Sequence, residues 1–185
     1  MNTRIETLNP ETATGKSKEL FDKVKNKMGM VPNLLKVMGN SPATLETYLA
    51  FGQLTEKGNF QPQFREQLAL AIAETNSCDY CLSAHTFIGS KQGLSGEEID
   101  NNRQGLSADS KTQVALQFAK KVTDNKGKIS TQDLETFKTA GFNDEDVMEI
   151  ILNVVSNTLT NYVNHIAETI VDFPKVEAGK FSTTV

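Results

Sequence analysis

The sequence predicts an all-α fold, a single-domain helical bundle of about seven to eight helices over residues 1–185. Apolar residues recur at intervals of three and four through most of the chain. Proline and capping signals stand at the starts of these stretches. No stretch shows the apolar–polar alternation of a half-buried strand. At 185 residues, with 38% hydrophobic and 23% charged residues, such a chain buries a sufficient core without disulfides or metal.

The first helices are marked by their ends. Residues 13–28 carry an apolar stripe among lysines, and Gly29 follows as a stop signal. Pro42 and Pro62 each occupy a first-turn position, where a missing N–H costs nothing. After Pro62, apolar residues at helical spacing predict a helix over residues 62–76.

The later helices are marked by capping patterns and by one long stripe. Ser95-Gly-Glu-Glu98 and Ser130-Thr-Gln-Asp133 resemble capping boxes. Residues 114–122 form an amphipathic stripe. Residues 147–171 continue the apolar spacing without Gly or Pro, which predicts one helix of about 37 Å. We expect this helix to form the spine of the bundle or part of a subunit interface.

Charge and terminal composition indicate where the protein acts. The net charge of −4 disfavours nucleic acid and anionic membrane surfaces as partners. The first residues contain no apolar signal segment, and no apolar run approaches the ~20 residues that span a bilayer. We therefore expect a cytoplasmic protein, in which paired cysteines tend to be reduced and reactive.

The only two cysteines, Cys78 and Cys81, stand three residues apart at a predicted helix start. Backbone N–H groups and the helix dipole stabilise a thiolate in that position. His85 follows Cys81 by four residues, so both side chains lie on one helix face. The imidazole can there accept the thiol proton and return it later.

A carboxylate is expected beside this histidine. If residues 62–76 form a helix and the chain reverses near residues 76–77, the two helices pack antiparallel. Glu66 then lies opposite the second or third turn of the next helix, close to His85, and would orient the imidazole. Glu74 would lie near the reversal and Cys78, and is a lesser candidate.

Other interpretations of these residues stay open. The cysteines could be two small buried hydrophobic residues. Cys78, Cys81 and His85 are also possible zinc ligands, with His165 or Glu66 as the fourth, although a bundle of this size has little need of zinc.

Two aromatic side chains are secondary candidates for the site. Tyr80 either packs in the core or lines the site of the cysteine pair with its hydroxyl. His165, on the long helix, is either an interface or core histidine or a functional one.

At this point the chain resembles a known family. Glu66, eleven residues, then Cys78-x-x-Cys81-x-x-x-His85 is similar to the signature of the alkylhydroperoxidase D / carboxymuconolactone decarboxylase superfamily. The stretch Asn161-Tyr-Val-Asn164-His165 through Pro174, and Met30-Val-Pro-Asn-Leu-Leu, resemble its peroxidase-related branch. One departure is visible: the best-known alkylhydroperoxidase D enzymes have a second histidine between the cysteines, where this chain has Tyr80.

The resemblance implies an all-α fold, a homo-oligomer (trimer or hexamer) and reduction of hydroperoxides. It also implies that Cys81 is oxidised to sulfenic acid, that Cys78 donates a proton and closes the disulfide, and that His85 and Glu66 relay protons. The decarboxylase branch uses no such cysteine pair, which disfavours lactone decarboxylation here.

The predicted function is a thiol-dependent peroxidase with a hydroperoxide substrate and an external dithiol reductant, without metal or other cofactor. The alternative is a protein disulfide oxidoreductase or redox sensor that cycles the same cysteine pair without peroxide specificity. A metal-dependent or structural oligomeric module is the third interpretation.

Overall fold

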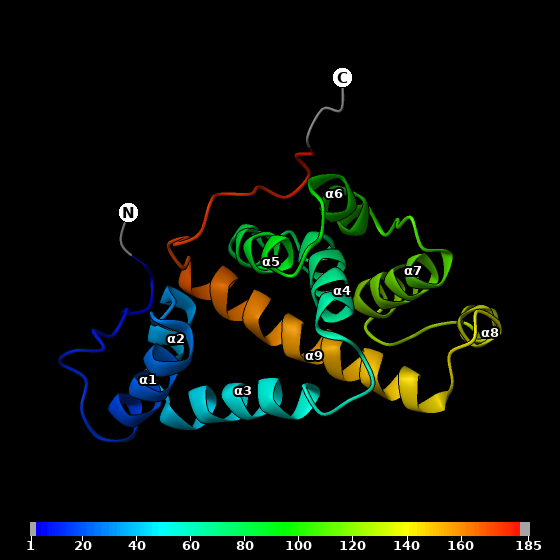
Figure 1. Cartoon of the computed structure of the whole chain (residues 1–185). Helices are drawn as coiled ribbons and strands as arrows, with labels where there is room; N and C mark the ends of the chain where they lie inside the picture. The colour runs from blue at the N-terminus through cyan, green and yellow to red at the C-terminus, as the bar shows by residue number, and fades with distance from the viewer. Residues whose placement is uncertain (1–2, 182–185) are drawn as a thin grey trace.

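The computed structural model describes residues 3–181 (Figure 1). This part of the chain is all-helical, which confirms the predicted fold class. It contains nine helices: α1 (Gly15–Met28), α2 (Asn33–Met38), α3 (Pro42–Thr55), α4 (Pro62–Thr75), α5 (Asp79–Lys91), α6 (Gly96–Gln104), α7 (Ser110–Asp124), α8 (Thr131–Thr139) and α9 (Asp144–Ala167).

The helix ends follow the local chemistry of the sequence. Gly29 ends α1 in the left-handed region at φ 78°, a backbone conformation that glycine adopts without steric cost. Pro42 and Pro62 open α3 and α4 at the first turn, as predicted. Ser130 and Asp133 form the predicted capping box of α8.

Three details differ from the sequence predictions. The described residues contain nine helices instead of seven or eight, because α2 is only six residues long and too short to show a helical period. Ser95 caps α6 by accepting the Glu98 N–H, but the Glu98 carboxylate binds other groups instead of completing a box.

The third difference is the position of the long helix, which runs from Asp144 to Ala167 where residues 147–171 were predicted. It begins three residues earlier because Asn143 and Asp146 form a capping box. It ends four residues earlier because Glu168 adopts a left-handed conformation at φ 48° and donates its N–H to the Asn164 carbonyl. Ile170 and Val171 therefore lie outside the helix.

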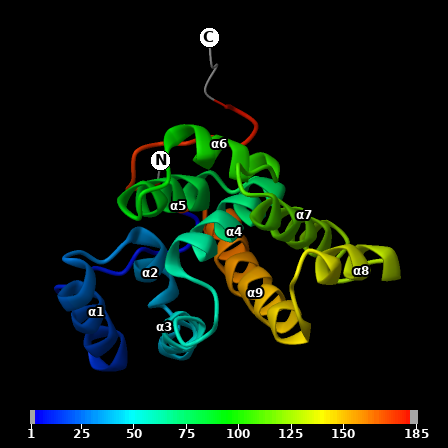
Figure 2. The same ribbon diagram turned by 45° about the vertical axis from the view of Figure 1, so that its right-hand side comes forward.

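The long helix α9 crosses the molecule beneath α4 and α5 (Figures 1 and 2), and it contacts α2, α3, α4, α5 and α7. Helix α4 is central, packing against α5, α6, α7 and α9. Two clusters of buried apolar residues lie on either side of it. One includes both cysteines together with side chains of α1 and α2, and the other joins α4 to α7, α8 and α9.

After α9 the chain continues without helix and passes over α5 toward α6, in red at the top of Figures 1 and 2. Backbone amides of this segment bind α5 directly. Val176 N donates to the Ser83 hydroxyl at 2.9 Å, and Ala178 N donates to the Asp79 carboxylate at 2.9 Å. Within residues 3–181, no helix combines the length and apolar character that crossing a bilayer requires.

Candidate active site

The turn between α4 and α5 places the cysteines. Helix α4 ends at Thr75, and Ser77 takes a left-handed conformation at φ 53° that reverses the chain. The Cys78 N–H then bonds back to the Ala73 carbonyl at 2.9 Å, the 6→1 bond of a helix-ending motif. This geometry makes Cys78 the N-cap of α5.

Cys78 and Cys81 are joined by a disulfide, with their Cα atoms 5.3 Å apart, inside the range that such bonds span. Both residues are buried, at 2% and 3% exposure. The backbone N–H of Cys81 points to Cys78 Sγ at 3.3 Å, as an N-cap geometry requires. The backbone donor that a helix start provides is therefore directed to the first cysteine of the pair.

His85 and Glu66 meet across the α4–α5 interface. The Nδ1 atom of His85 lies 2.8 Å from Glu66 Oε2, and their side chains are 21% and 15% exposed. Gly89, one turn after His85, leaves room for Leu94, because a Cβ there would lie 3.0 Å from Leu94 Cδ1. The predicted juxtaposition of Glu66 and His85 is thus present, and their catalytic roles stay predictions.

Tyr48 on α3 is a neighbour of this pair that the sequence did not indicate. Its burial, and secondly the negative charge of Glu66, raise the pKa of its phenol. The hydroxyl therefore stays protonated at neutral pH. No spacing signal linked α3 to the cysteines, since the connection depends on how α3 packs.

The hydroxyl of Tyr80, the residue between the two cysteines, forms hydrogen bonds with groups outside the cysteine pair. That hydroxyl donates to Asp172 Oδ1 at 2.8 Å and accepts the Leu34 N–H at 3.1 Å. Burial raises the pKa of the phenol far above its ordinary value. Asp172 also accepts the Asn33 N–H at 2.8 Å, so Tyr80 and Asp172 together bind the start of α2. These contacts describe a packing and anchoring role.

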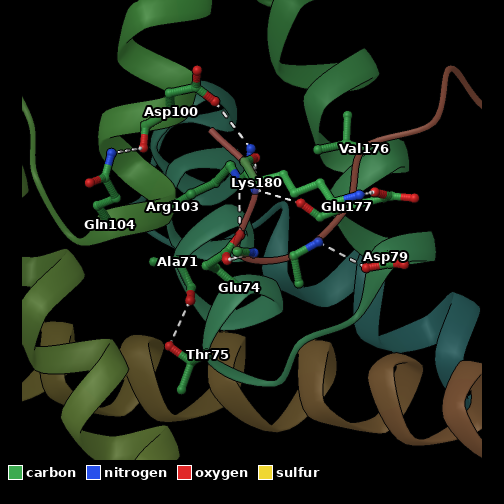
Figure 3. Close-up of polar contacts among 12 residues, drawn as sticks. Ala71, Glu74, Thr75, Asp79, Asp100, Arg103, Gln104, Val176, Glu177 and Lys180 are labelled. Atoms are coloured by element: carbon green, nitrogen blue, oxygen red, sulfur yellow. Dashed lines mark hydrogen bonds and ion pairs between the residues drawn. The ribbon is translucent and has the colours of Figure 1, made fainter. Parts of the chain in front are cut away.

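Glu74 lies at the end of α4, and its carboxylate forms an ion pair with Arg103 of α6 (Figure 3). Its Oε2 atom is 2.8 Å from Arg103 Nε, and its Oε1 accepts the Gly179 N–H at 2.6 Å. Arg103, 2% exposed, also contacts Asp100 at 3.1 Å and donates to the carbonyls of Glu177 and Lys180. Glu74 therefore holds the C-terminal segment against α6.

His165 is exposed on α9, and its Nε2 atom donates to the Asn76 carbonyl at 2.9 Å. Asn76 also donates from Nδ2 to Asn161 Oδ1 at 2.7 Å. These two contacts attach α9 to the turn that carries the cysteines. His165 is thus placed as an anchor of that turn.

Sequence reasoning missed Asn164, whose Nδ2 atom donates to Cys81 Sγ at 3.3 Å. Asn164 and Asn161 are 5% and 0% exposed and lie three residues apart on the buried face of α9. A signal was available, because asparagines recur along the longest helix at Asn153, Asn161 and Asn164, which all lie on its buried face, and buried polar groups need partners.

Within residues 3–181, no group of three or more His, Cys, Asp and Glu side chains is gathered as metal ligands would be. In this structure the two sulfurs are bonded to each other, and Nδ1 of His85 bonds to Glu66.

Residues 42–123, which run from the start of α3 to one residue before the end of α7 and include Glu66, Cys78, Cys81 and His85, match the model of the carboxymuconolactone decarboxylase family. No curated protein sequence matches the chain.

Solved structures resemble the whole described fold. A peroxidase-related protein with an alkylhydroperoxidase AhpD core from Ralstonia eutropha JMP134 is 21% identical with a TM-score of 0.79, and the match covers 93% of each chain. A peroxidase-related protein from Silicibacter sp. TM1040 is 26% identical with a TM-score of 0.76, covering 91% of this chain and 93% of that one. The debrominase Bmp8, solved in complex with 2,3,4-tribromopyrrole, is 16% identical with a TM-score of 0.78 over 93% of each chain.

Proposed function

We propose that this chain, whose residues 42–123 match the carboxymuconolactone decarboxylase family, is a member of that family and a thiol-dependent peroxidase built on an alkylhydroperoxidase D-like fold. One observation carries the proposal: the Cys78–Cys81 pair lies one helical turn before an imidazole that is bonded to a carboxylate at 2.8 Å. Such an arrangement combines a nucleophile, a proton carrier and a group that orients the carrier.

The proposed reaction begins with the reduced pair. The Cys81 thiolate attacks the terminal oxygen of a hydroperoxide; the O–O bond breaks, Cys81 becomes a sulfenic acid, and the alcohol leaves after taking up a proton through His85 or Cys78. The Cys78 sulfur then attacks the sulfenic sulfur and water departs, leaving the disulfide. An external dithiol reduces that disulfide by thiol–disulfide exchange and is itself oxidised.

The positions of the groups support these proposed roles. Cys78 is bonded to Cys81 in this structure, which is the bond that the resolving partner forms. Glu66 fixes the ring of His85 by binding Nδ1, which leaves Nε2 to exchange a proton. The peroxidase-related neighbour at 26% identity supports this reaction class. The likenesses to the AhpD-core protein at 21% identity and to a debrominase at 16% identity support the fold alone.

The experiment that tests the proposal measures peroxide consumption by the reduced protein and maps its cysteines by mass spectrometry. We expect one equivalent of peroxide to consume both thiols in the wild type. Cys81→Ser should abolish the reaction. Cys78→Ser should still form one sulfenic acid, trapped by a dione reagent, and no intramolecular disulfide. Near-normal turnover by Cys81→Ser would refute the assignment.

A second set of variants separates peroxidase from general disulfide exchange. Glu66→Gln should slow peroxide reduction at least ten-fold, since acid–base catalysis contributes about 10²–10⁴, while helical circular dichroism is unchanged. Glu135→Gln, on α8 at the far end of α9 from the cysteines (Figure 1), is the matched control. Equal loss of disulfide-substrate reduction and peroxide reduction, or faster turnover with protein disulfides, would favour an oxidoreductase instead.

A further inference from the structure

The two cysteines of the pair receive different hydrogen-bond donors. Cys78, at the N-cap of α5, accepts the backbone N–H of Cys81 at 3.3 Å. Cys81, the third residue of α5, receives a side-chain donor from another element, Asn164 Nδ2 on α9, also at 3.3 Å. The helix start therefore favours a thiolate at Cys78, whereas a thiolate at Cys81, the proposed nucleophile, receives its hydrogen bond from α9.

Cys81 needs such a donor because it is buried at 3% exposure. Burial away from water disfavours the charged form of a thiol, and a hydrogen bond to the charged form favours it. A sulfur that bears a full negative charge is also a stronger acceptor than one in a disulfide, so this contact strengthens when the pair is reduced.

Asn164 is held in place for this contact. Its neighbours on α9, Asn161 and His165, bind Asn76 at the α4–α5 turn at 2.7 and 2.9 Å. The Oδ1 atom of Asn164 is buried and has no hydrogen-bond partner among residues 3–181. A buried unpaired acceptor costs stability, and such departures from full pairing are typical of functional sites.

We propose that Asn164 is a further catalytic residue, whose amide stabilises the Cys81 thiolate and so selects Cys81 over Cys78 as the sulfur that attacks the peroxide. This inference rests on the proposed function for its catalytic meaning. The charge on the sulfur can nevertheless be measured without any peroxide.

Other ionisable groups lie around the two cysteines. They are the same in the Asn164 variants and in the control variant described below. The side chains that α1 and α2 contribute to the same core cluster are apolar. The titratable groups on the elements packed around the cysteines include Asp79, Tyr80 and His85 on α5, Glu66 and Glu74 on α4, Tyr48 on α3, His165 on α9 and Asp172 in the C-terminal segment.

The test titrates the Cys81 thiolate by its ultraviolet absorbance in the Cys78→Ser background, where Cys81 is the single cysteine. Asn164→Leu removes the donor with little change in volume, and we expect the pKa of Cys81 to rise by about one to two units. Asn153→Leu is the matched control, since Asn153 is a buried asparagine on the same helix whose amide binds the Glu149 carbonyl. If Asn164→Leu loses its helical circular dichroism, Asn164→Ala should raise the pKa in the same direction.

The rate of sulfenic acid formation against pH is the second readout. In Asn164→Leu this rate should fall ten-fold or more at pH 7 and return toward the parent value at high pH, where the thiol is ionised in both proteins. A rate lowered equally at every pH, or a pKa that matches the Asn153→Leu control, would overturn the inference. A pKa shift in a protein that ignores peroxide would instead overturn the proposed function and leave the role of Asn164 intact.

Discussion

Replacing Arg103 by methionine should be among the most damaging single changes in this protein. Arg103 is 2% exposed and binds the Glu74 carboxylate at 2.8 Å and Asp100 at 3.1 Å (Figure 3). Its Nη2 atom donates to the carbonyls of Glu177 and Lys180, each at 2.9 Å. Methionine fills much of the volume but provides none of these donors.

The size of the stability loss follows from the Glu74 carboxylate, which stays in place without its cation. Glu74, whose side chain is 11% exposed, loses its cation and becomes a mostly buried, uncompensated charge. Removing one partner of a buried pair costs about 3–5 kcal/mol, out of the roughly 5–15 kcal/mol that stabilises an ordinary domain. With a slope of about 2 kcal/mol per molar urea, the unfolding midpoint should fall by about 2 M.

Urea unfolding followed by circular dichroism measures the loss, and a double variant tests its cause. Arg103→Met combined with Glu74→Met removes both charges and should recover part of the stability, because the unpaired carboxylate is gone. Trypsin should also cleave after Lys175 and Lys180 faster in Arg103→Met than in the wild type. A single-variant loss below about 1 kcal/mol, or a double variant that is still less stable, would refute the reasoning.

Two further predictions concern pH and assembly. Burial alone would raise the pKa of Glu98, but hydrogen bonds from Ser107, Asn102, Ala108 and Gln67 outweigh burial and lower the pKa below its ordinary 4.5. The lowered pKa stabilises the folded state fully above pH 4.5, and this stabilisation is lost as the pH falls through the lowered pKa. The fall in melting temperature between pH 6 and pH 3 should therefore be smaller in Glu98→Gln, and an identical fall in both proteins would contradict this. The homo-oligomer of three or six chains stays a prediction, for which the exposed apolar stripe of α9 (Met148, Ile151, Val155, Tyr162 and Ile166) is the expected interface. Ile166→Glu should then reduce the mass measured by sedimentation while Glu135→Lys on α8 should not, and a wild-type monomer would exclude the assembly.

Most of the fold could be predicted because its signals are local. Proline at the first turn of α3 and α4, and glycine after α1, mark helix ends through the backbone of one or two residues. The end of α9 was misplaced because Glu168, not a glycine, takes the left-handed conformation there. A non-glycine residue in that region is held by its surroundings, which a single sequence does not display.

The same distinction between local signals and long-range packing applies to the candidate site. The Glu66–His85 contact joins residues only 19 apart, on neighbouring antiparallel helices, so spacing along two helices was enough to predict it. The Asn164–Cys81 contact joins residues 83 apart and depends on how α9 crosses α5. The partners of Glu74 could not be predicted for a similar reason, because Arg103 and Gly179 reach it from distant parts of the chain.

Helix α9 has two faces, one expected to form the subunit interface and one that contacts the site of the cysteines. Its exposed apolar residues recur at intervals of three, four and seven residues and form one stripe. Asn161 and Asn164 lie on the opposite, buried face and contact the turn and the sulfur. If the stripe is the subunit interface, association fixes the position of α9, and with it the distance from Asn164 Nδ2 to Cys81 Sγ. A dissociated Ile166→Glu protein should then show a raised pKa for the Cys81 thiol, whereas an unchanged value would mean that a single chain suffices to hold the amide on the sulfur.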